Sequence, residues 1–155
     1  MTRRKTSRVL VAALLTAFSA LLWPSHGAAQ DKGEKLPMRI VVNAEGAPTR
    51  VSREDLVRIF LGKKTIWESG ARIAPAMIEE EAGTMQPFMD RVLKKTVEQY
   101  RTYWKRLLFS GGGTAPRTFR NSSQVIEFVA KQPGAIGVVE PSANDDRVKT
   151  VEVEG

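Results

Sequence analysis

The sequence predicts an α/β fold, a single small domain in which a mostly parallel mixed sheet is flanked by helices. Two runs of apolar, largely β-branched residues, 38–42 and 135–139, are typical of strands buried on both faces. Between them, apolar residues recur at helical spacing in several segments. Because strand and helix patterns alternate along the chain, a sheet covered by helices is the expected architecture.

Helix starts are marked by side chains able to cap the first turn. Ser52 stands three residues before Asp55, and Thr96 stands three residues before Gln99, which is the spacing of a capping box. A further helix is expected to start near Asn121. The three starts divide the region between the two buried strands into helical segments.

Other segments are less regular. Residues 73–78 are expected to form a strand, and Pro75 within it indicates an edge or crossover position because proline cannot donate to a sheet. Residues 83–94 are expected to form a helix. Near the carboxyl terminus, Val151 and Val153 alternate with charged residues, which is typical of a half-exposed edge strand.

One helix carries an aromatic stripe. Tyr100, Tyr103 and Trp104 recur with leucines at helical spacing, so the stripe is expected to pack in the core, with stacking on a ligand as the alternative. The predicted core draws on several elements and includes Phe60, Trp104, Leu107, Ile126 and Val129.

The amino terminus has the pattern of a secretory signal. A basic start precedes an apolar run over residues 9–23, and Gly27, Ala28 and Ala29 then fit the small-residue cleavage rule. The run is shorter than the about 20 residues that span a membrane, which favours cleavage over an uncleaved anchor. We therefore expect a signal peptide at 1–29, a linker at 30–37, a domain at 38–155 and a periplasmic location. Membrane contact is expected only through the signal segment before cleavage.

Composition excludes several classes of function. The chain has no cysteine, and its only histidine, His26, precedes the expected cleavage site. Catalysis by His or Cys and metal sites ligated by them are therefore excluded from the mature chain. Cleavage also removes four basic residues and no acidic residue, which lowers the net charge from +7 to +3. This weak field argues against nucleic-acid binding. We expect no enzymatic activity, no metal and no cofactor.

Three further segments carry a family resemblance. In chain order they are 59–67 (IFLGKKTIW), 81–84 (EAGT) and 133–140 (PGAIGVVE). They are similar, respectively, to a helix end and loop, to a Ser-Gly-Thr motif that opens a helix, and to a turn and strand in the phosphate-binding components of bacterial phosphate ABC transporters. The resemblance covers roughly residues 38–153 and implies a fold similar to one lobe of a periplasmic binding protein.

The resemblance implies an oxyanion held by backbone N–H groups, hydroxyls and an arginine. By resemblance, Gly83 and Thr84 supply ligand contacts. Two departures point to weak binding, because Ala82 stands where the motif has serine and Ile78 stands where the family often has arginine. Arg117 and Arg120 flank the glycines at 111–113. They are the best basic candidates to contact a bound anion.

Two other features have competing interpretations. The glutamates at 79–81 are expected to complement a helix dipole themselves, with phosphate binding beside them and a Ca²⁺ site as alternatives. The glycines at 111–113 could cradle a phosphate through backbone N–H groups. They lack the Lys-Ser/Thr ending of a P-loop, which favours a connector.

Two classes of function stay open. The first is a periplasmic substrate-binding-like protein that binds phosphate or a related oxyanion weakly in uptake or sensing, with a transporter or sensor protein as partner. The second is a protein-interaction or accessory module that keeps the binding-protein fold without binding a ligand. Fold alone does not decide between them.

Overall fold

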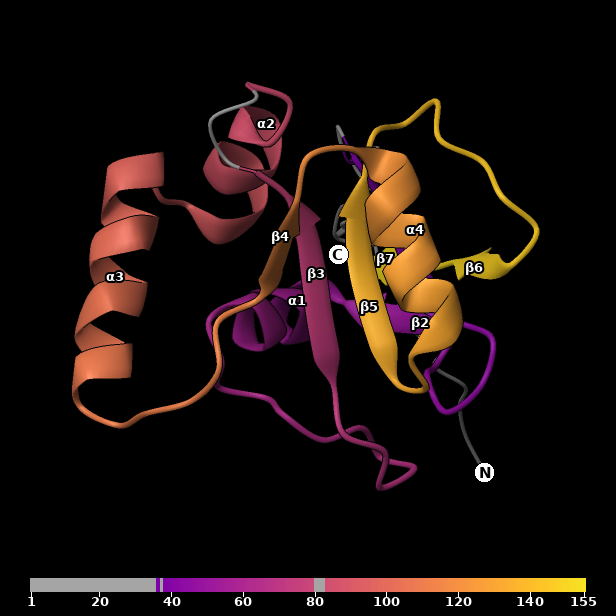
Figure 1. Ribbon diagram of the computed structural model, residues 1–155, viewed down its shortest axis with the longest axis horizontal. Coiled ribbons are helices and arrows are strands. Elements are labelled where there is room, and N and C mark those ends of the chain that lie inside the picture. Colours follow the sequence, from indigo (N-terminus) through magenta and orange to yellow (C-terminus); the bar gives the residue numbers. More distant parts are fainter. Residues whose placement is uncertain (1–35, 37, 80–82) are drawn as a thin grey trace, which may run out of the picture. The chain divides into compact units, whose positions relative to one another are not determined.

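The main sheet has five strands in the order β4-β3-β5-β1-β6 (Figure 1). The computed structural model describes residues 36, 38–79 and 83–155. β3 runs parallel to β4 and β5, whereas β1 runs antiparallel to β5 and β6. The strands of this sheet are β1 (Arg39–Asn43), β3 (Ala74–Ile78), β4 (Arg117–Phe119), β5 (Ala135–Val139) and β6 (Val148–Thr150). The predicted α/β architecture and both buried strands are confirmed, and the sheet is mixed.

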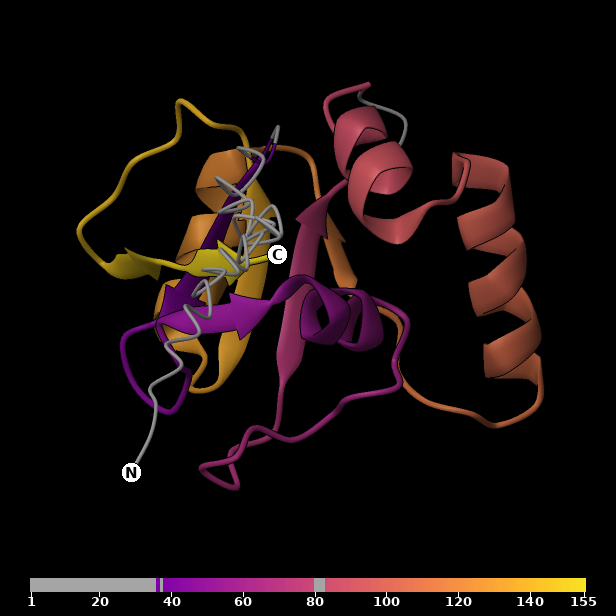
Figure 2. The ribbon, with the colours of Figure 1, turned by 180° about the vertical axis from the view of Figure 1, so that it is seen from behind.

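Helices cover both faces of this sheet. α4 (Ser122–Lys131) crosses β5 on the face seen in Figure 1, and α1 (Arg53–Phe60) lies on the opposite face, seen in Figure 2. Every residue of β5 is buried, as expected for a strand enclosed on both sides. α3 (Val97–Phe109) stands beside the β4 side of the sheet in both views.

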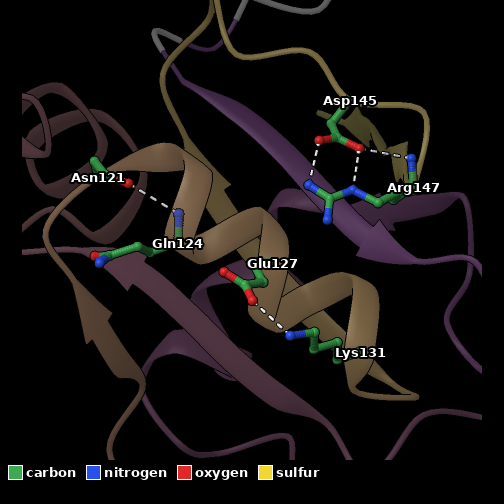
Figure 3. Close-up of polar contacts among 6 residues, drawn as sticks. All are labelled: Asn121, Gln124, Glu127, Lys131, Asp145 and Arg147. Carbon is green, nitrogen blue, oxygen red and sulfur yellow. Dashed lines mark hydrogen bonds and ion pairs between the residues drawn. The ribbon is translucent and has the colours of Figure 1, made fainter.

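The three predicted helix starts are confirmed by their caps. The Ser52 hydroxyl accepts a hydrogen bond from the Asp55 amide at 3.0 Å, and the Asn121 side chain accepts one from the Gln124 amide at 3.0 Å (Figure 3). Before α3, the Thr96 side chain and its partner three residues later form a complete capping box. Each cap satisfies an amide that the helix itself leaves unpaired.

The helix predicted at 83–94 is shorter and of another type. A three-residue α2 (Gln86–Phe88) leads directly into a five-residue π-helix, η2 (Met89–Leu93). Pro87 lies in the first turn of α2, where its missing N–H costs nothing. The apolar residues of this segment are buried as their spacing indicates: Met85, Phe88, Met89, Val92 and Leu93.

Of the two positions expected for the strand with Pro75, the edge is wrong and the crossover is confirmed, because crossover connections join β3 to its parallel neighbours. β3 lies between β4 and β5. Its pairing with β4 begins only at Ala76, one residue after the proline, so the proline precedes the part of the strand that has neighbours on both sides. Proline is tolerated at such a position because no β4 partner stands opposite it.

The carboxyl-terminal strand is divided between two sheets. β6 ends at Thr150 on the edge of the main sheet, and β7 (Glu152–Glu154) pairs in parallel with β2 (Arg50–Ser52) in a separate two-stranded sheet. Val151, between them, is buried, and Val153 is half-buried. The alternation of Val151 and Val153 with charge thus predicts the exposure but not the change of sheet.

The predicted core is confirmed at four positions and corrected at one. Phe60, Trp104, Ile126 and Val129 are buried, whereas Leu107 is half-buried. The reason is that the carboxyl-terminal end of α3 leaves the rest of the fold, so Leu108 is 51% and Phe109 86% exposed. The expected signal peptide at 1–29 lies outside the described residues, as does most of the linker. In the described part, no helix is long and apolar enough to span a membrane.

Candidate functional site

The carboxyl ends of β3, β4 and β5 meet at one edge of the sheet because these strands run parallel. The Glu79 amide donates to the Phe119 carbonyl at 2.8 Å, which ties the start of the loop after β3 to the end of β4. Ligands of open α/β sheets bind outside the carboxyl ends of the strands. We call this end of the sheet, where the carboxyl ends of β3, β4 and β5 lie, the carboxyl edge. It is the first candidate site.

Gly83 and Thr84 lie in the loop between β3 and α2. Gly83 is exposed and has a φ of 70°, the left-handed region that glycine enters without strain. The Thr84 hydroxyl oxygen is buried and has no hydrogen-bond partner among the described residues. Buried hydroxyls are normally hydrogen-bonded, so this one is a donor with unused capacity. Residues 80–82, which include two of the three glutamates and Ala82, lie outside the described residues.

The loop does not lead directly into a long helix. α2 begins at Gln86, its N-cap Met85 provides no side-chain cap, and the Gln86 amide donates to the Gly83 carbonyl at 3.3 Å. α2 continues directly into η2, so the helical segment after the loop runs over 86–93. Gly83 and Thr84 precede the first residue of this segment, so their amides lie before its first turn rather than in it.

The two arginines singled out by the sequence lie at opposite ends of β4, one at its start and one just after its last residue. Arg120 follows the strand directly at the carboxyl edge and is exposed, and its amide donates to the Gln124 side chain at 3.1 Å. Arg117 is the first residue of β4. Its guanidinium carbon lies 5.3 Å from the centre of the Phe128 ring on α4. Arg117 is thus engaged in a cation–π contact, whereas Arg120 lies next to the strand end that bonds Glu79.

A contact that the sequence did not indicate occupies the start of α4. The Glu140 carboxylate accepts a hydrogen bond from the Ser122 hydroxyl at 3.2 Å, and that hydroxyl accepts one from the Glu140 amide at 3.1 Å. The protein therefore places its own carboxylate at the positive end of α4. The two residues are 18 positions apart, and the sequence signal was only that the 133–140 segment ends in a glutamate.

Ile78 belongs to the core. It is 2% exposed and pairs with Phe119 in the parallel ladder between β3 and β4. An arginine at this position would place a guanidinium among apolar side chains, which is costly without a partner. The departure from the family pattern at Ile78 is therefore built into the packing of β3.

The other ligand hypotheses have structural answers. The amides of Gly111 and Gly112 donate to the carbonyls of Leu108 and Leu107 at 3.0 and 2.8 Å, so the glycine run caps the end of α3. Tyr100 is buried, and its hydroxyl donates to a backbone carbonyl of α1 at 3.0 Å. The glycine run is thus a connector, and the aromatic stripe packs against α1.

The resolved pKa shifts lie on exposed ion pairs drawn in Figure 3. Hydrogen bonds from the side chain and backbone of Arg147 lower the pKa of Asp145 to about 2, and the same pair raises the pKa of Arg147. A hydrogen bond and the charge of Lys131 lower the pKa of Glu127. These pairs lie along α4 and the loop after β5. Among the described residues, no group of three or more His, Cys, Asp or Glu side chains could hold a metal ion.

No protein-family model matches the chain, and no curated protein matches its sequence. Solved structures do match its fold. PstS from Borrelia burgdorferi aligns with a TM-score of 0.57 at 15% identity, over 77% of this chain and 47% of that one. A Clostridium perfringens protein assigned as a phosphate ABC transporter substrate-binding protein, with bound phosphate, aligns with a TM-score of 0.55 at 16% identity, over 76% and 44%.

An ABC-type phosphate transport receptor from Vibrio cholerae aligns with a TM-score of 0.50 at 19% identity, over 76% of this chain and 46% of that one. The chain thus spans less than half the length of each of these structures. The Vibrio cholerae protein is described as a receptor and the Clostridium perfringens protein as a substrate-binding protein. Because the identities are at most 19%, the likeness shows a similar fold and nothing further. The fold of this chain is that of about one lobe of the binding proteins of phosphate ABC transporters.

Proposed function

We propose that the chain is a substrate-binding-like protein that binds phosphate or a related oxyanion weakly at the carboxyl edge, through Gly83, Thr84 and Arg120. The observation that supports this most is the buried, unpartnered hydroxyl of Thr84. It lies in the loop after β3 of a fold similar to phosphate-binding proteins. The role would be in uptake or sensing, with a transporter or sensor protein as partner.

The proposed binding is weak for physical reasons. A two-lobed protein closes around its ligand and excludes water, which strengthens every polar contact, whereas one lobe leaves the anion partly hydrated. Glu79 and Glu140 also bring negative charge to the same edge. We therefore expect a Kd in the high micromolar range or weaker.

Titration with inorganic phosphate, followed by amide chemical shifts in NMR, tests the proposal. Saturable shifts are expected at Gly83, Thr84 and Arg120. Thr84→Val removes the hydroxyl at nearly constant volume and should weaken binding by about tenfold or more, since a hydrogen bond to a charged group contributes about 1.5–3 kcal/mol.

Thr102→Val is the matched control, because Thr102 is exposed on α3, and it should leave the titration unchanged. Arg117→Gln separates the two arginines: binding that depends on Arg117 rather than Arg120 would move the site to the α4 side of β4. Submicromolar binding would overturn the expectation of weak binding. Chemical-shift changes that Thr84→Val leaves intact would overturn the assignment of the site to this loop.

A second function, a protein-interaction module, is favoured by the end of α3. Leu108 and Phe109 are exposed there, and Phe109 is more exposed than any other large apolar side chain in the described part of the chain. An exposed aromatic side chain next to an exposed leucine could serve as an anchor for a protein partner. Phe109→Ser should abolish cross-linking to a periplasmic partner while leaving the phosphate titration unchanged.

A further inference from the structure

A half-enclosed cavity of about 350 Å³ lies at the opposite edge of the sheet from the candidate anion site. It is formed by the loop after β1, by β2, by the start of α1 and by the loop after α1. The Gly134 amide, just before β5, donates to the Glu45 carbonyl at 3.2 Å, which places these loops at the amino ends of the parallel strands. We call this cavity the amino-edge pocket.

The walls of the amino-edge pocket are held by hydrogen bonds. Trp67, a buried wall residue, donates from its indole nitrogen to the Gly134 carbonyl at 2.8 Å. The Ser69 hydroxyl donates to the Gly46 carbonyl at 3.1 Å, which joins the two loops across the pocket. A pocket whose walls are fixed before binding loses little freedom when a ligand enters.

The lining carries charges of both signs. Lys64 and Asp55 form an ion pair at 2.6 Å, and their side chains are only 21% and 28% exposed. Arg50 and Glu68 add one further charge of each sign. The uncharged part of the wall combines two serines with apolar residues that include Ala47, Pro48 and Val51. The lining is thus neutral overall but has a fixed positive and a fixed negative group side by side.

This arrangement selects against ions of a single sign. Phosphate would face Asp55 and Glu68, and a simple cation would face Lys64 and Arg50. A small zwitterion matches both groups, because the ammonium of Lys64 has three donors and the carboxylate of Asp55 has two acceptor oxygens. Their mutual bond at 2.6 Å joins Lys64 Nζ to Asp55 Oδ2. The other oxygen, Oδ1, has the Arg58 guanidinium 3.9 Å away, which is longer than a hydrogen bond and leaves Oδ1 able to accept one from a ligand.

We propose that the amino-edge pocket is a second binding site, which takes an α-amino acid with a short apolar side chain. The ligand carboxylate accepts hydrogen bonds from Lys64, its ammonium donates to Asp55, and its side chain contacts Pro48 and Val51. The size of the cavity lies in the range of small-molecule sites, about 300–1,000 Å³. This site is separate from the proposed phosphate site and does not depend on it.

NMR titration of the full chain with L-valine tests the proposal. Saturable shifts are expected at the Trp67 indole N–H and at the amides of Ser69 and Lys64. N-acetyl-L-valine lacks the ammonium and L-valinamide lacks the carboxylate, so each should bind about tenfold more weakly or worse. These two probes need no mutation and therefore test the charge requirement in the folded wild-type chain.

Two substitutions and two controls complete the test. Lys64→Met and Asp55→Asn should each weaken L-valine binding by about tenfold or more, whereas Lys63→Met, at an exposed neighbour outside the pocket, should not. Thr84→Val should leave L-valine binding intact, which separates this site from the phosphate site. Absent shifts at the pocket, binding of either blocked probe as tightly as L-valine, or competition by phosphate would each overturn the proposal.

Discussion

At the scale of single residues, the sharpest electrostatic feature is the ion pair of Asp145 with Arg147. The Arg147 guanidinium donates to both carboxylate oxygens, at 2.9 and 2.7 Å, and its amide donates to the same carboxylate at 3.0 Å. These bonds stabilise the ionised form and lower the pKa of Asp145 from 3.8 to about 2. The ion pair is local, because its two residues are only two positions apart in the sequence.

Replacing Arg147 tests that cause. Arg147→Met removes the side-chain bonds but keeps the backbone bond, so the pKa of Asp145 should rise part of the way back to its ordinary value of 3.8. Because the folded-state pKa is lowered, the pair stabilises the fold above about pH 4, and this stabilisation is lost as pH falls toward 2. Carboxyl NMR titration measures the shift. Lys131→Met is the control: it should raise the pKa of Glu127 and leave Asp145 unchanged.

Which residue contacts could be predicted depends on their sequence separation. The capping residues Ser52, Thr96 and Asn121 act on amides three positions away, so their patterns were readable. The contact of Ser122 with Glu140 depends on β5 returning beside the start of α4, and no local pattern encodes it. At the candidate site, sequence resemblance pointed to Gly83 and Thr84, but the unpartnered state of the Thr84 hydroxyl is a tertiary property.

At the scale of elements, the segment after β3 shows where periodicity misleads. Spacing of apolar residues predicts which side chains are buried, but an α-helix and a π-helix differ only in the backbone partner that each amide chooses. The Lys94 amide donates to the Met89 carbonyl, five residues back, and Lys94 has a φ of 52°. The π-helix therefore ends in a left-handed residue that is not glycine.

This ending makes a prediction about stability. A left-handed non-glycine residue costs roughly 1–2 kcal/mol, whereas glycine costs about 0.5–1 kcal/mol in unfolded-state entropy. Lys94→Gly should therefore raise the free energy of unfolding by up to about 1 kcal/mol. Lys95→Gly, with no left-handed backbone to relieve, should lower it. Urea denaturation measures both, and a loss of stability in Lys94→Gly would contradict the argument.

At the scale of the whole molecule, the described residues form one hydrophobic core, although the chain aligns with less than half the length of each structural relative. In the core, α4 packs on β5 and β1, and α1 packs on β2 and η2. The alternating strand and helix patterns were sufficient to predict buried strands covered by helices. The order of the strands was not predictable, because β4 and β2 have only three residues each and carry no periodic signal. Both strands line or flank the candidate sites, so the sites were harder to predict than the core.

The close packing of α4 on β5 depends on Gly137. A Cβ atom there would lie 2.7 Å from a methyl carbon of Val125 and 2.9 Å from one of Val129, closer than side chains pack. Gly137→Ala should therefore push α4 outward and lower the free energy of unfolding by about 1–3 kcal/mol. Adding Val125→Ala makes room for the new methyl group, so the double variant should be less destabilised than the sum of the two single changes. Urea denaturation of the wild type, the two single variants and the double variant measures this coupling, and strict additivity would show that α4 and β5 do not meet at Gly137.

Because α4 carries Ser122, the outward shift should also lengthen the hydrogen bonds between Ser122 and Glu140. The Glu140 amide should therefore exchange faster with solvent in Gly137→Ala than in the double variant.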